Sequence, residues 1–223
     1  MTKAVFFKEW LKVRICYLCA VAVVLAFTIY ALMRISRIIT LKGVGHVWEL
    51  MIGRDMIFMD IMQYVFPVAG IALAAAQFAP EMLQKRMKLT LHLPVSQIRM
   101  TFTMLGVGAG ILLALFASSA VVSGIYLSGI VPPELTGRIL LTMTPWYLAG
   151  LAAYFLVAWI ITEPTLYMRI IAALITVAVL RMFYLSADPE SYNCALPMLA
   201  WATLSFAGFS WLSVLRFKAG AQD

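Results

Sequence analysis

Few side chains in this sequence have the type and spacing needed to bind a metal ion or carry out catalysis. Only two histidines are present, His46 and His92, and there is no HExxH pattern of the kind that binds zinc in metalloproteases. Methionine recurs at every third position at Met56, Met59 and Met62, and thioether sulfur is a ligand that copper(I) accepts. Methionine also fills gaps between packed helices, and the chain has 14 of them. We therefore expect no bound metal ion and keep these three methionines as weak copper candidates.

Nucleotide hydrolysis on this chain is excluded by the absence of a phosphate-binding loop. No lysine is followed by serine or threonine, so the GxxxxGK[ST] pattern, whose backbone amides and lysine hold the phosphates, does not occur. We predict that the chain is not an enzyme and carries no cofactor of its own.

The most distinctive segment is a basic stretch, residues 81–99, between two long apolar runs. Its first part, Met82 to Leu93, can form a short helix that ends before Pro94. On such a helix Lys85, Lys88 and His92 share one side. These charges either fix the orientation of the chain in the membrane or form a surface that docks a cytoplasmic partner.

The composition of the chain is that of a membrane protein. Hydrophobic residues make up 64% of the sequence, charged residues only 12%, and the mean hydropathy is +0.95. A hydrocarbon core roughly 30 Å thick needs about 20 apolar helical residues. We predict an all-α, polytopic fold with six transmembrane helices. The predicted spans are Ile15 to Met33, Ile57 to Phe78, Thr101 to Leu127, Ile139 to Ile161, Met168 to Leu185 and Pro197 to Leu215.

Orientation follows from the lysines and arginines, which are retained on the cytoplasmic side near the ends of spans. With both termini in the cytoplasm, eleven of the 17 basic residues lie inside. The segment 79–99 and the tail 216–223 are then cytoplasmic, and the stretch 34–55 lies on the outer side. The net charge of +7 is explained by contact with anionic lipid, and no pattern typical of a nucleic-acid surface is present.

The first 14 residues have the pattern of an amphipathic helix that lies in the membrane interface. Phe6, Phe7 and Trp10 fall on one apolar stripe, whereas Lys8 and Lys12 are charged. The apolar run that follows contains no small-residue cleavage site before Arg34, so we predict an uncleaved interfacial helix over residues 1–14 rather than a signal peptide.

Small residues in the third predicted span mark a face on which another helix can come close. Gly106 and Gly110 lie one helical turn apart. This face could pack against a second copy of the chain or against another helix of the same chain.

Taken in order, these features resemble the permease subunit of an ATP-binding-cassette (ABC) transporter of the second export type. The resemblance covers essentially the whole chain: an amphipathic elbow with Phe7-Lys8-Glu9-Trp10, a span, an outer stretch, a second span ending near Glu81, and a charged short helix that ends at Leu93-Pro94-Val95-Ser96. In that family the charged loop after the second span is the coupling helix, which fits a cleft in the partner ATPase. The resemblance implies that the ATPase-contacting residues here are Glu81, Gln84, Lys85, Arg86, Lys88, Leu89, Leu91 and Pro94.

The resemblance implies a function for the whole assembly. Two copies of a separate ATPase, which bind ATP and Mg, would work with a dimer of this chain or of this chain and a relative in the inner membrane. Hydrolysis would drive export or extrusion of a hydrophobic or amphipathic substrate, since the outer segments are short. The alternative is a scaffold or anchor subunit of an enzyme or assembly complex that moves nothing. That complex could be related to copper, because some permeases of this family belong to assembly systems for copper enzymes.

Overall fold

The computed structural model describes residues 2–83, 96–186 and 188–218, and in these ranges the chain forms helices and no β-strand. The all-helical class is thereby confirmed. The helices are α1 (Thr2–Lys42), α2 (Val44–Gly53), α3 (Met62–Leu83), α5 (Gln97–Ser128), α6 (Pro133–Thr162), α7 (Leu166–Met182), a 3₁₀ turn η1 (Asn193–Ala195), α8 (Leu196–Ser205) and α9 (Ala207–Lys218).

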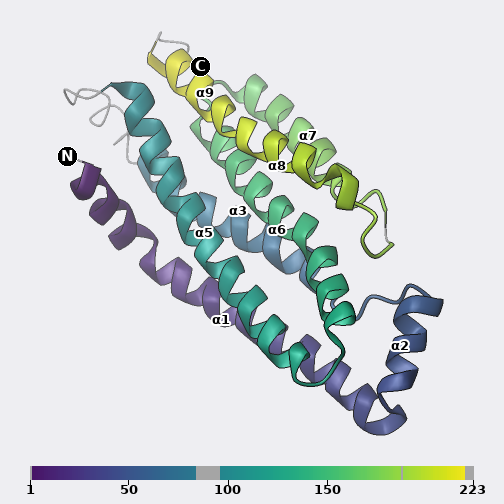
Figure 1. Ribbon diagram of the computed structural model, residues 1–223. Helices are drawn as coiled ribbons and strands as arrows, with labels where there is room; N and C mark the ends of the chain where they lie inside the picture. Colours follow the sequence, from purple (N-terminus) through teal and green to yellow (C-terminus); the bar gives the residue numbers. More distant parts are fainter. Residues whose placement is uncertain (1, 84–95, 187, 219–223) are drawn as a thin grey trace.

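The chain runs along the bundle in alternating directions (Figure 1). Helix α1 leads away from the N-terminus, α3 returns, and α5, α6, α7 and the α8–α9 pair follow in turn. The end of the bundle that holds the start of α1, the end of α3 and the end of α9 is called the terminal end below. The opposite end, beside α2, is called the distal end.

Five segments of the described chain are long and apolar enough to cross a membrane, which makes this a multi-pass membrane protein. These segments are Phe6–Lys42, Met62–Leu83, Gln97–Ser128, Pro133–Thr162 and Asn193–Arg216. The fifth of the six predicted spans coincides with α7, which has 17 residues and is therefore about 26 Å long at 1.5 Å per residue. The second predicted span begins later than expected, because helix starts only at Met62 and residues 54–61 form bends and turns.

Helix α1 is a single helix of 41 residues that includes both the predicted elbow and the first predicted span. No glycine or proline occurs between Thr2 and Lys42, so nothing in the sequence interrupts it. The same helix continues through the first part of the predicted outer stretch, and α2 follows directly after Gly43. Gly43 takes up a left-handed φ of 82°, which lets the chain reverse there.

The core is centred on a close approach of α3 and α6. A Cβ atom added to Gly70 of α3 would collide with the backbone carbonyl of Gly150 on α6, and one added to Gly150 would lie 2.9 Å from the Phe66 carbonyl oxygen. Only glycine allows the two backbones to come this close. Phe66 stacks edge-on against Phe116 of α5, with ring centroids 5.2 Å apart, and so joins a third helix to this contact.

A proline inside α3 creates a hydrogen-bond acceptor that the helix cannot satisfy. Pro67 has no N–H, so the carbonyl of Gln63, one turn earlier, lacks its helical donor. The hydroxyl of Tyr184 donates to that carbonyl at 2.7 Å from the loop after α7.

Candidate functional site

A buried network of charged and polar side chains joins four helices near the terminal end of the bundle. Its centre is Lys12 of α1, whose ammonium group donates to both carboxylate oxygens of Glu9 at 3.0 Å and to Oε1 of Glu81 on α3 at 2.8 Å. Glu9 is fully buried, Glu81 is 1% exposed, and the Lys12 side chain is 13% exposed. Such groups are costly to bury unless they are paired, and here both carboxylates share one cation.

The network continues from the ion pairs into the middle of the bundle. The amide of Gln77, also on α3, donates to Oε2 of Glu9 at 3.1 Å and to the Met104 carbonyl of α5 at 2.8 Å. Its carbonyl oxygen accepts from the hydroxyl of Tyr154 on α6 at 2.7 Å. Gly108 of α5 leaves room for this contact, since a Cβ there would collide with both the Tyr154 hydroxyl and Gln77 Oε1.

Charge within the network is balanced by a second lysine at its edge. Lys8, whose side chain is 41% exposed, lies 2.9 Å from Oε1 of Glu81. Two lysines therefore face two glutamates. The other oxygen of Glu81, Oε2, is buried and has no hydrogen-bond partner within the described part of the chain. Glu81 thus contacts α1 through one carboxylate oxygen, and Gln77, one turn earlier on α3, adds its own hydrogen bond to Glu9.

A third buried carboxylate lies at the end of α6. Glu163 is fully buried, and it accepts from the Ser213 hydroxyl and, at 3.2 Å, from the guanidinium of Arg216, both on α9. The Glu163 backbone carbonyl accepts from Arg169 of α7 at 2.7 Å. Glu81 lies in the last turn of α3 and Glu163 directly follows α6, and each connects the end of its helix to neighbouring helices.

The predicted coupling residues fall mostly outside the described ranges. Glu81 is described, and its buried side chain faces α1. The others, Gln84, Lys85, Arg86, Lys88, Leu89, Leu91 and Pro94, lie in the segment 84–95, outside the described residues.

The predicted elbow residues divide between an exposed and a buried face of α1. Phe6 and Phe7 are 53% and 61% exposed, whereas Lys12 is bonded into the network. Trp10 is partly buried and stacks at a tilt against Tyr17, with ring centroids 5.6 Å apart. In this part of α1 the apolar side chains of Phe6 and Phe7 are thus exposed, and the charged side chain of Lys12 packs inside the protein.

The three candidate methionines do not share one helix face, because only Met62 lies in α3. Met59 and Met62 are buried in the core and Met56 is 43% exposed. Among the described residues no group of three or more His, Cys, Asp or Glu side chains is placed to hold a metal ion.

Gly106 and Gly110 line an open groove of about 480 Å³ between α1 and α5. No atom lies within 4 Å of a Cβ added at either glycine. Aromatic side chains of Phe6, Trp10 and Tyr17 form the α1 wall of this groove. The two predicted packing glycines thus border open space within the described part of the chain.

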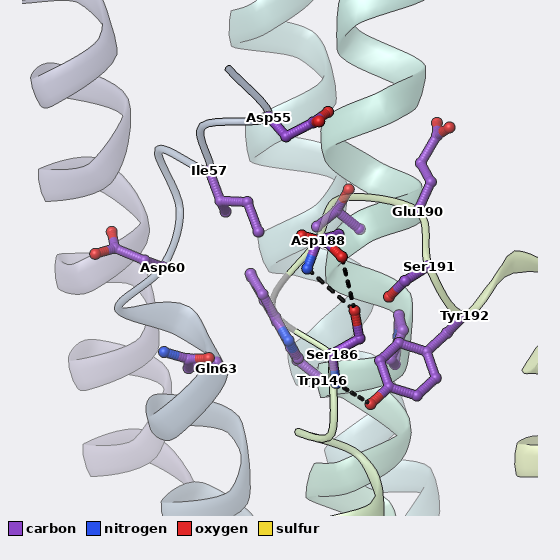
Figure 2. Close-up of a pocket in the computed structure, with 12 residues that line it drawn as sticks. Asp55, Ile57, Asp60, Gln63, Trp146, Ser186, Asp188, Glu190, Ser191 and Tyr192 are labelled. Atoms are coloured by element: carbon purple, nitrogen blue, oxygen red, sulfur yellow. Dashed lines mark hydrogen bonds between the residues drawn. The ribbon is translucent and has the colours of Figure 1, made fainter. Parts of the chain in front are cut away.

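A polar cavity of about 220 Å³ lies at the distal end, between the start of α3, α6 and the loop before η1 (Figure 2). Asp188 bonds to Ser186, and the Tyr192 hydroxyl accepts from the Ser186 backbone N–H at 3.1 Å. Two further carboxylates of the lining are paired with arginines: Asp55 with Arg138 at 2.6 Å and Asp60 with Arg34 at 2.8 Å. Figure 2 shows Asp60 pointing away from Asp188, so these carboxylates do not converge on one point.

The contribution of the Tyr154–Gln77 hydrogen bond to stability can be measured with Tyr154→Phe. The variant removes the donor to Gln77 Oε1 and leaves that buried oxygen without a partner, so we expect the free energy of unfolding to fall by about 2 kcal/mol. Chemical denaturation in detergent micelles gives the value. The matched control is Tyr64→Phe on α3, where the side chain is 65% exposed and the expected change is under about 0.5 kcal/mol. Equal stability of Tyr154→Phe and the wild type would contradict the assigned hydrogen bond.

Comparisons with protein-family models, with curated proteins and with solved structures found no match to this chain.

Proposed function

We propose that this chain is the permease subunit of an ABC transporter of the second export type, with six spans, an elbow at residues 1–14 and both termini in the cytoplasm. The observation that carries the proposal is the buried network that links α1, α3, α5 and α6. It lies directly before the basic segment 84–95, where the end of α3 would have to transmit force to the rest of the bundle.

The alternating path of the helices supports the same proposal. The ends of α3, α6 and α9 lie together at the terminal end, and that end carries eight of the 14 basic residues in the described ranges. Under the positive-inside rule this is the cytoplasmic face. The membrane is then the inner membrane, and the segment 84–95 is available to a cytoplasmic ATPase.

The proposed mechanism begins on the partner chain. Two ATPase copies bind ATP and Mg, close on each other and pull the segment 81–94. Because Glu81 is bonded to Lys12, displacement of the end of α3 also displaces α1. The open face at Gly106 and Gly110 is the proposed contact with a second protomer, either identical or related. Rearrangement between the protomers would then open a path for a hydrophobic or amphipathic substrate.

A scaffold or anchor subunit is the second candidate. A permanently paired polar network also suits a rigid anchor, and such a chain would need no ATPase. The three methionines give no support to a copper-related version, because two of them are buried in the core.

Replacing Lys85, Arg86 and Lys88 together by alanine separates the two candidates. We expect affinity purification of the intact chain from native membranes to recover an ATPase, and the triple variant to recover at least about tenfold less, which corresponds to about 1.4 kcal/mol of lost affinity. Mass spectrometry of the co-purified proteins measures this.

A matched control removes the same number of charges from the distal end: Arg37, Lys42 and Arg54 to alanine. This variant should retain the ATPase. If neither the wild type nor any variant recovers an ATPase, the transporter proposal fails and the scaffold becomes the better explanation.

A further inference from the structure

A second groove, distinct from the one at Gly106, lies against the distal half of α1. It has a volume of about 550 Å³ and is lined by Tyr30, Met33, Arg34, Ser36, Arg37, Thr40 and Leu41 of α1 and by Tyr126 of α5. All the α1 members follow helical spacing, so they form one stripe along the helix.

The walls of this groove are apolar and aromatic, and they are exposed. Tyr30 is 56%, Met33 64% and Leu41 74% exposed. Tyr30 and Met33 belong to the end of an uncharged apolar run of the sequence, residues 15–33. Tyrosine is enriched at the depth where hydrocarbon gives way to headgroups, so Tyr30 and Tyr126 place that boundary within the groove.

Side chains with cationic and hydroxyl donors follow directly after this boundary along α1. Arg34 is already neutralised, since its guanidinium pairs with Asp60 at 2.8 Å. Arg37 is exposed, and neither its guanidinium nor the Ser36 hydroxyl has a hydrogen-bond partner among the described residues. Arg37 lies seven positions after Tyr30 on α1, which is about 10 Å along the helix axis.

The arrangement matches one class of molecule. A phosphate ester favours a planar guanidinium and a hydroxyl donor, and the acyl chains attached to it favour the exposed apolar wall. A soluble anion would not use Tyr30 and Met33, and a neutral hydrocarbon would not use Arg37.

We propose that the groove at Tyr30, Arg37 and Tyr126 is a binding site for one phospholipid with an anionic headgroup, whose phosphate pairs with Arg37. Occupation of the site gives Arg37 a partner and explains why a free cation is placed at the end that otherwise holds the fewer basic residues of the sequence. The proposal does not depend on the transporter assignment.

Native mass spectrometry of the full chain in nonionic detergent tests the proposal. The probes are palmitoyl-oleoyl phosphatidylglycerol, which is anionic, and palmitoyl-oleoyl phosphatidylcholine, which has the same acyl chains. For the wild type we expect half-saturation by one phosphatidylglycerol at a concentration several-fold below that for phosphatidylcholine. In Arg37→Gln this preference should disappear, and Arg37→Lys should keep most of it.

The matched control is Arg181→Gln, which removes an exposed arginine from the last turn of α7 at the same end of the bundle. It should keep the wild-type preference. The proposal is overturned if the wild type binds both lipids equally, if Arg37→Gln keeps the preference, or if Arg181→Gln loses it to the same degree. Arg37→Met, which retains a long apolar stem, replaces the glutamine variant if the latter does not yield folded protein.

Discussion

Replacing Gly70 by alanine should strongly destabilise this protein. The new Cβ would collide with the backbone carbonyl of Gly150, and it would also lie 3.3 Å from the backbone nitrogen of Tyr154. Backbone atoms of a packed helix cannot rotate away as the end of a side chain can. Helices α3 and α6 must therefore separate, and we expect a loss of about 3 kcal/mol in the free energy of unfolding, the upper part of the range for overpacked cores.

Denaturant unfolding in micelles, followed by tryptophan fluorescence, measures the loss. Gly137→Ala on α6 is the matched control, because nothing lies within 4 Å of its added Cβ, and alanine is the better helix former. That variant should be as stable as the wild type or slightly more stable. If Gly70→Ala is as stable as Gly137→Ala, the close approach of α3 and α6 is wrong.

Replacing Lys12 by methionine should be comparably damaging for an electrostatic reason. Methionine preserves much of the volume of the lysine stem but leaves the buried carboxylates of Glu9 and Glu81 without their shared cation. Removal of one partner from a buried ion pair costs about 3 kcal/mol or more. We expect a drop of that size in the free energy of unfolding, and reduced yield of folded protein from membranes.

A double-variant cycle with Glu9→Gln isolates the ionic contribution. Glu81 keeps its ion pair with Lys8, so Glu9 carries the charge that Lys12→Met leaves unpaired, and glutamine removes it. Lys12→Met combined with Glu9→Gln should therefore be less destabilised than the sum of the two single variants, by about 1 kcal/mol or more. Additive effects would show that Lys12 and Glu9 do not interact. An exposed lysine at the opposite end, Lys42→Met, supplies the control and should unfold like the wild type.

The class of fold could be predicted from composition because long uncharged runs have few alternatives in a bilayer. The C-terminal ends of α5 and α6 lie within one residue of the ends predicted from such runs, whereas both helices begin several residues earlier than predicted. The start of α3 could not be predicted in this way, because residues 57–61 are as apolar as those that follow. The helix begins only at Met62, after a turn that contains Met59 and Asp60.

The buried network could not be predicted from the sequence, since its central ion pair joins residues 69 positions apart. A partial signal is present: Gln77 and Glu81 are four residues apart in an otherwise apolar helix, and Glu9 precedes Lys12 by three. Those spacings indicate polar faces on two helices but not that the faces meet. Tyr154 gives no signal of its own, because a tyrosine in an apolar run is equally suited to the lipid interface.

The length of α1 has a mechanical consequence. At 1.5 Å per residue its 41 residues extend about 62 Å, roughly twice the thickness of the hydrocarbon core. A helix of that length acts as a lever: a tilt of one degree about one end moves the other end by about 1 Å. The ion pair of Lys12 with Glu81 joins α1 to α3 near one end of α1, and the groove at Arg37 lies near the other end. Small rotations at the Glu81 contact are therefore amplified into displacements at the far membrane surface.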